Sequence, residues 1–394
     1  METVKKETNL FFNKNLQIIY LITLMAVLSV ISITPALPMI AREFKISSNH
    51  VGLLIIATTL PGVFLTPLLG VLADRYGRKK VLAPSLLLFA ISGFACFFAN
   101  SFELLVLLRF LQGVGSACLG SLNVTLIGDL FKGKERMRAM GYNASVLSIA
   151  TASYPFIGGL LASIDWRFVF LLPLLAVPIA LAVIYKLDNP EPQKVQTLKE
   201  YLSSAFSSIK NRNALILFSL SVITFIILYG TYVTYFPVFL DEMFAAKPFI
   251  IGLIMSAMSL VTAIVSSQLG KITEKFGEKT ALILSFVMYA LALSLIPTAG
   301  SIYVLLIPVL IYGFGHGINI PSIQTMLSNI APLEYRAAFM SMNGMVLRVG
   351  QTLGPVIMGL VFSISSITSV FIAGAVFAVA GVVLLFFMKV PAKD

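Results

Sequence analysis

Long apolar stretches recur along the whole chain of 394 residues. A helix needs about 20 mostly apolar residues to cross the hydrocarbon core of a bilayer. Stretches of that length lie near residues 16–41, 51–72, 81–100, 104–128, 139–163 and 167–187, and again near 213–240, 249–270, 280–299, 302–327, 337–361 and 366–388. Their spacing predicts an all-α membrane protein of twelve transmembrane helices in two six-helix bundles.

The composition agrees with a chain that is mostly surrounded by lipid. Hydrophobic residues make up 58% of the sequence and charged residues 11%, whereas a soluble domain has about 25% charged residues. Cys96 and Cys118 both lie in apolar stretches, which is typical of small packing residues and not of a disulfide or a metal site. The stretch 16–41 is too long for a signal-peptide core, so we interpret it as the first membrane helix.

A polar segment divides the chain into three parts. We expect an N-terminal six-helix bundle over 1–187, a cytoplasmic linker over 188–212 and a C-terminal six-helix bundle over 213–394. Apolar side chains in the linker follow helical spacing at Leu198, Tyr201, Leu202, Phe206 and Ile209. This spacing predicts an amphipathic helix on the membrane surface.

Basic residues predict how the chain is oriented in the cell membrane. Lys and Arg favour cytoplasmic loops. One side would hold the N-terminus, the linker, Arg75, Arg78, Lys79, Lys80, Lys132, Lys134, Arg136, Arg138, Lys271, Lys275, Lys279, Arg336, Lys389 and Lys393, and the other only Arg42, Lys45, Arg167 and Lys247. Both termini are therefore predicted to be cytoplasmic. The net charge of +11 then serves topology, and we expect no nucleic-acid partner.

The sequence repeats itself at an offset of 200 residues. The segment 70–79 aligns with 270–279, and further identities without a gap are Gly113 with Gly313, Gly115 with Gly315, Arg136 with Arg336, Pro155 with Pro355, and Gly159 with Gly359. Each half has six spans, so the halves share one topology and should be related by an axis along the membrane normal. The substrate site is expected between them, near mid-membrane.

Two motifs are similar to signatures of a known family. The run GVLADRYGRKK at 70–80 resembles the loop between helices two and three of the major facilitator superfamily. The run LLRFLQGVG at 107–115 resembles the second signature of its twelve-helix drug:proton antiporter branch. The resemblance covers the whole chain. It implies that helices one, four, seven and ten line a central cavity, while three, six, nine and twelve face lipid.

The resemblance assigns a cytoplasmic gate to Gly70, Asp74, Arg75, Gly77, Arg78 and Asp129. Gly70 would permit close approach of another helix, and Asp74 would be stabilised by the positive end of the dipole of helix eleven. Arg75 and Arg78 are expected to pair with Asp129. The alternative is a basic turn that only fixes topology. In the second half Glu278 replaces the arginine, so we expect a weaker, structural cluster there.

Two arginines lie inside predicted spans, Arg109 and Arg348. A charge at mid-membrane costs about 2.5–3.5 kcal/mol on insertion scales, so such residues usually face the protein interior and have a function. Gln112 and Gln351 each follow three residues later and share the face of their arginine. The resemblance gives Arg109 a part in coupling or in holding the cavity open, and the alternative is a structural arginine bonded to helix carbonyls. Arg348 aligns with Ser148, so the repeat does not explain it.

Further candidates for coupling or for the cavity lie in helices seven and ten. His316 and Asn319 occur in the run GFGHGIN of helix ten. Histidine can carry a proton near neutral pH, although packing among glycines is the alternative. Tyr229 and Tyr232 on helix seven could line an aromatic wall suited to amphipathic substrates. For the neighbouring Tyr235 and Phe236, a lipid-interface belt is an equal alternative.

Glycine and proline are concentrated in helices five and eleven. Gly158 and Gly159 belong to a partial match to the glycine-rich signature of the antiporter branch, and Gly354 and Pro355 give a closer match to its core. Small residues let helices approach closely, and proline bends them. We expect these residues to form a tight, bent interface between the halves.

Acidic residues are confined to loops, tails and helix ends, and Ser29 stands about where family members can have an acid. The expected cavity would then hold two arginines, one histidine and no obvious carboxylate. This balance favours anionic or zwitterionic substrates over cationic drugs. Coupling could run through His316, through Asp129 or Asp74, or be absent.

The remaining motifs separate the classes of function. A Walker loop, paired catalytic carboxylates, a nucleophile constellation and a metal or cofactor motif are not seen, so neither an enzyme nor an ATP-driven pump is expected. The leading hypothesis is a monomeric secondary transporter that exports a small amphipathic compound by alternating access, with a proton as the coupling ion. The alternative is an organic-anion carrier, for uptake or exchange, that uses Arg109 and Arg348. A membrane sensor is a third class, which would need a large soluble domain or a degraded motif loop.

The gate hypothesis can be tested by replacing Asp74 with Asn. The substitution removes the charge without changing the size of the side chain. Transport should fall, while the amount of protein in the membrane, measured by immunoblotting, should not. Normal transport in Asp74→Asn would overturn the gate assignment.

Overall fold

The computed structural model describes residues 10–188, 211–330 and 336–388, and the predicted amphipathic helix of the linker lies outside them. The described chain is helical and contains no strand within these ranges. Twelve of its helices are long and apolar enough to cross a membrane. The prediction of an all-α protein with twelve spans is therefore confirmed.

The first half contributes six spans. They are α1 (Lys14–Ile31) with a 3-10 turn at Thr34–Ala36 and α2 (Leu37–Glu43); α3 (Gly52–Tyr76); α4 (Arg78–Ala95); α5 (Phe102–Ser116) with α6 (Leu119–Leu130); α7 (Gly133–Ile164); and a 3-10 stretch (Trp166–Leu175) with α8 (Ala176–Lys186).

The second half contributes the other six. They are α10 (Arg212–Ile226) with a π-helix at Ile227–Tyr235 and α11 (Phe236–Phe244); α12 (Pro248–Ser267) with α13 (Leu269–Phe276); α14 (Glu278–Leu295); α15 (Ile302–Ile330); α16 (Arg336–Ile364); and α17 (Ile367–Phe386). The first and seventh spans are the most buried, in agreement with a central place for both.

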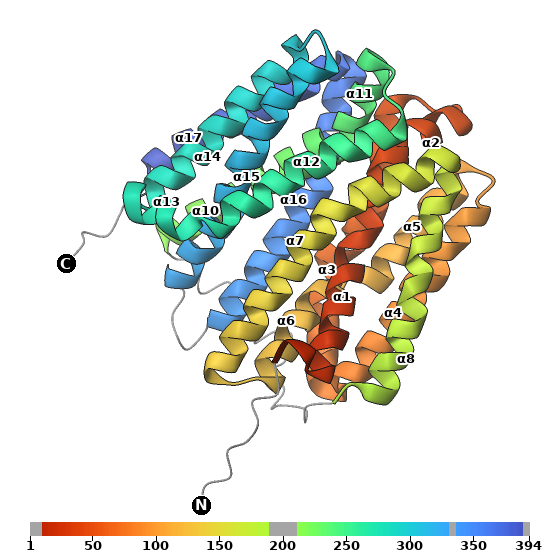
Figure 1. Ribbon diagram of the computed structural model, residues 1–394, viewed down its shortest axis with the longest axis vertical. Helices are drawn as coiled ribbons and strands as arrows, with labels where there is room; N and C mark the ends of the chain where they lie inside the picture. Colours follow the sequence, from red (N-terminus) through yellow and green to blue (C-terminus); the bar gives the residue numbers. More distant parts are fainter. Residues whose placement is uncertain (1–9, 189–210, 331–335, 389–394) are drawn as a thin grey trace, which may run out of the picture.

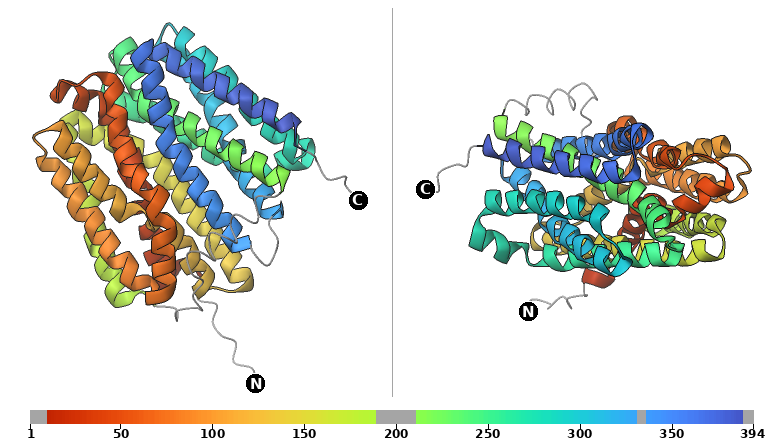
Figure 2. Two further views of the ribbon diagram at one scale, coloured as in Figure 1. Left: turned by 180° about the vertical axis from the view of Figure 1, so that it is seen from behind. Right: turned by 90° about the horizontal axis from the view of Figure 1, so that it is seen from above.

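The halves form two bundles that lie side by side (Figures 1 and 2). On one side of the molecule α7 of the first half packs along α12 of the second, and on the other side α3 packs along α16. The second and fifth spans of each half therefore form the junction. This symmetric arrangement is expected when both halves have the same topology.

Close contacts inside each bundle repeat at the same offset of 200 residues. A Cβ atom added at Gly113 would lie 2.5 Å from Thr58 O, and one added at Gly313 would lie 2.7 Å from Met258 O. Such distances exclude a side chain, so both glycines let the fourth or tenth span touch the backbone of the second or eighth. The duplication seen in the sequence is thus also a duplication of helix packing.

Glycine and proline also join the two bundles. A Cβ added at Gly252 of α12 would overlap Pro155 O and would lie 3.2 Å from Gly159 Cα. At the related junction, a Cβ on Gly52 of α3 would lie 2.9 Å from Tyr235 Oη and 3.4 Å from Pro355 Cβ. Each junction therefore places one glycine against the proline of the other half. At the α7–α12 junction the helices touch through backbone atoms.

The other two predicted packing residues act within the halves. Gly158 faces Ser32 O of the first span, where no Cβ would fit. A Cβ on Gly354 would lie 2.8 Å from Gly230 N of the π-helix. In helices five and eleven, Gly158 and Gly354 thus pack within their own bundle, while the next residues, Gly159 and Pro355, contact the other half. The sequence pattern predicts all four residues at the interface between the halves.

The junction is closed at one end of the molecule and open at the other. We call the end that carries Lys14, Arg78 and the start of α7 the basic end, and the end that carries α2 and α11 the opposite end. At the opposite end Arg42 forms an ion pair with Asp241, and the Tyr235 hydroxyl donates to Asn49 O over 2.7 Å. Toward the basic end, a Cβ on Gly70, Gly270 or Gly344 would have no described atom within 4 Å.

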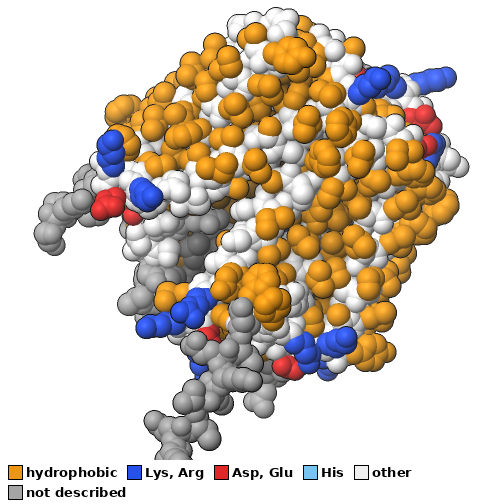
Figure 3. All heavy atoms as spheres, viewed as in Figure 1, with side chains coloured by type: hydrophobic (Ala, Val, Ile, Leu, Met, Phe, Trp, Pro, Cys, Tyr) orange, Lys and Arg blue, Asp and Glu red, His pale blue; other side chains and the backbone are white. Residues whose placement is uncertain are grey.

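The surface matches a bilayer. Figure 3 shows apolar side chains over the middle of the face in view, with Lys, Arg, Asp and Glu gathered toward its ends. Ile91, Leu181, Val287 and Val376 are 64%, 47%, 46% and 64% exposed, and they belong to the third, sixth, ninth and twelfth spans. The family resemblance assigned these spans to lipid, but other spans expose apolar side chains as well: Phe64, Ile149 and Leu260 of the second, fifth and eighth spans are 69%, 64% and 57% exposed.

Replacing Gly252 with Ala tests the α7–α12 junction. The added methyl group would overlap Pro155 O, and overpacking of this kind costs about 1–3 kcal/mol. The melting temperature of the purified protein in detergent should fall by several degrees. Gly128→Ala is the matched control, because its Cβ would meet no atom within 4 Å, and it should leave the melting temperature unchanged or raise it. Equal behaviour of the two variants would contradict the packing described.

Candidate functional site

The predicted gate residues meet at the basic end of the first half. Arg78 begins α4 and is buried, and its guanidinium pairs with Asp74 one turn earlier. Its Nε also donates to Asp129 Oδ2 over 3.1 Å, which joins α4 to the end of α6. Between α3 and α4, Gly77 turns the chain with φ of +97°, a conformation that glycine adopts without strain. One arginine thus bridges two carboxylates from two helices.

Arg75 behaves differently from the expectation. It is exposed, and its guanidinium lies 5.5 Å from the centre of the Tyr76 ring. Arg75 is only one residue from Asp74, so it points away from the face shared by Asp74 and Arg78. The expected pairing of Arg75 with Asp129 does not occur in this conformation.

The second-half copy of this cluster is weaker, as its sequence indicates. Glu278 occupies the place of Arg78, and Asn329, the equivalent of Asp129, donates from Nδ2 to Glu278 Oε1 over 3.4 Å. A single long hydrogen bond replaces two ion pairs. Lys279 instead donates to Met388 O over 2.7 Å, which anchors the end of the twelfth span.

Arg109 is held by the protein interior. Its side chain is 1% exposed and donates to Gln112 Oε1 over 2.7 Å, to Ser29 O over 2.8 Å and to Leu54 O over 3.5 Å. Ser29 lies just before α1 gives way to a 3-10 turn, so the guanidinium satisfies carbonyls near a break in the first span. This geometry favours the structural alternative considered for Arg109.

Arg348 reaches across the junction. A Cβ on Gly62 of α3 would lie 3.2 Å from its Cδ and Nε, and one on Gly120 of α6 would lie 3.9 Å from its Nη2. The guanidinium donates to Gln351 Oε1 over 3.2 Å, and Tyr229 is close enough to interact with its charge. The side chain is only partly buried. Arg348 and Tyr229 therefore come together between the halves, as the cavity hypothesis requires.

Helix seven separates the two tyrosines that were expected to act together. The π-helix Ile227–Tyr235 shifts the register, and Thr234 Oγ1 donates to Tyr229 O five residues earlier. Tyr229 is partly exposed, whereas Tyr232 is 3% exposed and stacks on Tyr312 at 5.0 Å between ring centres. π-Helices are rare and occur often at functional sites, although the sequence carries no local signal for this one.

Tyr235 and Phe236 do not form a lipid-facing belt. Both side chains are fully buried. The Tyr235 ring packs against Phe362 and its hydroxyl bonds across the junction, while Phe236 stacks on Tyr232.

His316 and Asn319 lie inside the second bundle. His316 is 8% exposed, and its Nδ1 bonds the Tyr289 hydroxyl. Asn319 is fully buried; it accepts from Thr224 Oγ1 over 2.7 Å and donates to Ser285 Oγ over 2.9 Å. These contacts connect helix ten to helices seven and nine. They favour the packing alternative for His316 in this conformation.

One asparagine in each half, outside the sequence motifs, joins the first and fifth spans of that half. Thr23 Oγ1 bonds Asn143 Oδ1 over 2.5 Å in the first half, and Ser221 Oγ donates to Asn343 Oδ1 over 3.2 Å in the second. Asn143 and Asn343 lie 200 residues apart, so the repeat carried a signal for them. Buried polar pairs of this kind bind membrane helices together.

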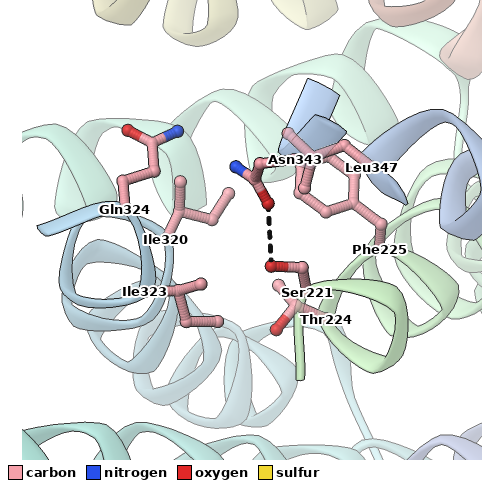
Figure 4. A pocket seen from close by; sticks show the side chains of 8 residues that line it. All are labelled: Ser221, Thr224, Phe225, Ile320, Ile323, Gln324, Asn343 and Leu347. Atoms are coloured by element: carbon pink, nitrogen blue, oxygen red, sulfur yellow. Dashed lines mark hydrogen bonds between the residues drawn. The ribbon is translucent and has the colours of Figure 1, made fainter. Parts of the chain in front are cut away.

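Asn343 also lines a hollow in the second half. The hollow is a small recess that is partly open to its surroundings. Figure 4 shows its lining side chains, Ser221, Thr224, Phe225, Ile320, Ile323, Gln324, Asn343 and Leu347. It lies between α10, α15 and α16. Its flanks are apolar, with hydroxyl and amide groups between them (Figure 4). Its Phe225 ring is 5.9 Å from the ring of Tyr229, so the hollow adjoins the Arg348 region.

The side chains between the halves can bind a small molecule, and the two bundles can move relative to each other. The described residues contain no group of three His, Cys, Asp or Glu side chains that could hold a metal ion. The inter-half region offers a guanidinium, amides, hydroxyl groups and aromatic rings, set between two bundles whose described bonds lie from mid-membrane to the opposite end.

Comparison with known proteins gives a consistent result. The family model described as Major Facilitator Superfamily matches residues 19–245 and 240–394. Multidrug resistance protein 1 of Bacillus subtilis is 27% identical over 96% of this chain and 98% of its own length. The class B tetracycline resistance protein of Escherichia coli is 25% identical over 89% of this chain and 89% of its own.

Among solved structures, a bacterial homologue of the human lysosomal transporter Spinster superposes with a TM-score of 0.81. It was determined in an inward-facing and occupied conformation, is 16% identical, and is matched over 96% of this chain and 98% of its own. At this identity the likeness concerns the fold alone.

The role of Arg109 can be decided by replacing it with Gln. The variant leaves buried carbonyls without a donor, and each lost hydrogen bond to a charged group is worth about 1.5–3 kcal/mol. We expect a clear fall in the melting temperature, measured by fluorescence-detected gel filtration. Arg138→Gln, at an exposed position of the basic end, is the control and should melt like the wild type. An Arg109→Gln protein that melts normally but does not transport would instead support a part in coupling.

Proposed function

The chain belongs to the major facilitator superfamily and is a multi-pass membrane transporter of that fold, and we propose that it exports a small amphipathic organic compound across the cell membrane by alternating access. The support for export comes from relatives such as Multidrug resistance protein 1, which match nearly the whole chain. The partly apolar, partly polar lining of the hollow beside Tyr229 suits an amphipathic substrate.

The observation that carries this proposal is the one-sided junction. The described inter-half bonds run from mid-membrane to the opposite end. They include Thr352 Oγ1 to Thr59 Oγ1 at 3.1 Å, Phe249 N to Ser163 Oγ at 3.1 Å, Thr34 Oγ1 to Met255 Sδ at 3.6 Å, Tyr235 Oη to Asn49 O, and Arg42 to Asp241. A carrier needs a state closed at one end and open at the other. Residues 1–187 and 213–394 would be the two moving units, joined by 188–212.

We place the gate at Asp74, Arg78 and Asp129, with Gly70, Arg75 and Gly77. In the conformation described, Gly70 faces open space and Asp74 pairs within its own half. When the basic ends approach, Asp74 would become available to the start of α16, where a helix dipole favours a carboxylate. With both termini cytoplasmic, the present conformation would face the cytoplasm.

Protons are the proposed coupling ion. The described acids of the basic end include Asp74 and Asp129, which share Arg78 and have side chains 42% and 15% exposed. His316 is the other proposed proton carrier, and it would have to leave its contact with Tyr289 to exchange a proton with solvent. A monomer in the bilayer is sufficient for this scheme.

The alternative function is uptake or exchange of an organic anion through Arg109 and Arg348. One observation favours it, namely the position of Arg348 between the halves. Arg109 adds little, because its bonds to Gln112, Ser29 and Leu54 leave its side chain 1% exposed.

Dye flux into proteoliposomes with an acidic lumen tests the proposal. If export is proton-coupled, protons leaving the lumen should drive dye inward above its equilibrium level, and nigericin should abolish the effect. Rhodamine B, ethidium and fluorescein would serve as zwitterionic, cationic and anionic probes. Asp74→Asn protein gives the background rate. Fluxes that equal this background for all three dyes would contradict the proposal, and anion exchange that ignores the pH gradient would support the alternative.

A further inference from the structure

Arg348 has an unusual environment for a charged residue within a span. The described hydrogen bonds of its side chain comprise one contact, to Gln351 Oε1 at 3.2 Å. The ion pairs of the described chain lie at the two ends of the molecule, and none of them includes Arg348. A guanidinium has five N–H donors arranged as a fork, so most of the donor capacity of Arg348 is unused by the described protein.

Arg109 shows how the same residue type is satisfied elsewhere in this membrane domain. It makes three described hydrogen bonds, two of them to backbone carbonyls, and is 1% exposed. The side chain of Arg348 is partly exposed and makes one described hydrogen bond. The two arginines differ in the number of hydrogen bonds because Arg109 lies within one bundle, whereas Arg348 extends out of its own bundle.

The side chain of Arg348 ends among small residues of the other half. Gly62 lies beside its Cδ and Nε, and Gly120 lies near Nη2. Larger side chains at these positions would occupy the space around the guanidinium. The N-terminal half thus leaves room at the head of Arg348 and, within the described residues, provides it with no counter-charge.

Comparison of the two repeats shows a cation at this position in the second half only. Arg348 replaces Ser148 of the first half, whose hydroxyl donates to Ala144 O over 3.0 Å on its own helix. One half therefore presents a neutral, self-satisfied hydroxyl at the position where the other presents a cation. Packing of the duplicated fold does not require the charge, since the first half packs without it.

An apolar wall stands next to the cation. Tyr229 is within electrostatic reach of Arg348, and its ring is tilted against Phe225 with centres 5.9 Å apart. Phe225 and Leu347 line the hollow of Figure 4. A ligand in this region would meet a guanidinium fork at one side and aromatic and aliphatic surface at the other.

We propose that Arg348, with Gln351 and Tyr229, is the subsite for a carboxylate group, and that the substrates of this carrier are amphipathic molecules that bear one. The inference rests on the proposed transport function and narrows it to carboxylates, zwitterions included. The planar guanidinium matches a carboxylate with two parallel hydrogen bonds. The apolar body of the substrate would lie along Phe225 and Leu347.

Equilibrium binding to the purified full chain in nanodiscs tests the subsite independently of flux. The probes are rhodamine B, which has a free carboxylate, and its ethyl ester, which has the same ring system without that anionic group. Fluorescence anisotropy should show tighter binding of rhodamine B to the wild type. Arg348→Gln should raise the dissociation constant of rhodamine B about tenfold or more, the usual effect of losing a charge-assisted hydrogen bond, and leave that of the ester unchanged.

Two further variants separate recognition from a structural role. Arg348→Lys keeps the charge without the fork and should give an intermediate constant, whereas Gly62→Ala crowds Cδ and Nε and should weaken rhodamine B binding without removing any charge. Ser148→Ala, at the repeat-related position, is the matched control and should bind like the wild type. If Arg348→Gln does not insert, the Lys and Gly62 variants carry the test.

The outcomes distinguish this inference from the exporter proposal. Equal binding of dye and ester, no binding of either, or equal weakening of both in Arg348→Gln would overturn the subsite. Arg348-dependent binding of rhodamine B without proton-driven flux would support the subsite and contradict export. Ethidium flux that survives in Arg348→Gln, with no binding preference for rhodamine B, would support export of cations and overturn the subsite.

Discussion

The architecture depends on two close helix contacts between the halves, α7 with α12 and α3 with α16. At the first, Gly252 meets Pro155 and Gly159; at the second, Gly52 meets Tyr235 and Pro355. Lipid tails are as apolar as the helices, so no hydrophobic effect drives these contacts, and close packing and hydrogen bonds must hold them. The rest of the inter-half surface is free to be a cavity, and the described ends of the bundles can be together on one side and apart on the other.

Charge inside the membrane is the second constraint, and the two arginines satisfy it in opposite ways. Arg109 is surrounded by oxygen atoms of the first half, including Ser29 O near the break in the first span. Arg348 leaves its own bundle and ends beside Gly62. A cation in a bilayer is expensive unless something compensates it. Oxygen atoms of its own bundle compensate the charge of Arg109. For Arg348 we assign this role to the carboxylate of the substrate. The same principle places Arg78 between Asp74 and Asp129 at the membrane edge, where Arg78 and Asp129 are largely buried and Asp74 is partly exposed.

Much of the fold was predictable because bilayer thickness fixes helix length and the 200-residue repeat fixes the relation of the halves. The Arg78–Asp129 pair was also predictable, since it follows from a motif with local geometry. What the sequence alone did not show depends on neighbours remote in the chain. The face of His316 is decided by Tyr289 and Tyr312, and the separation of Tyr229 from Tyr232 by a π-helix that no local propensity encodes. The sequence pattern also does not predict which end of the molecule is open, because a carrier must keep its two conformations close in free energy. Asn143 and Asn343, in contrast, could have been found from the repeat.

Distances between spin labels on the two bundles test the central claim, that the halves exchange which end is closed. Labels at Lys80 and Lys271 report on the basic end, and labels at Lys45 and Lys247 on the opposite end; all four side chains are exposed. The buried Cys96 and Cys118 would first be replaced by Ala. Double electron–electron resonance in nanodiscs should give two distance populations for each pair. The short basic-end population should rise together with the long opposite-end population when pH or ligand is changed. A single, condition-independent distance for both pairs, in a protein that still transports, would contradict the account.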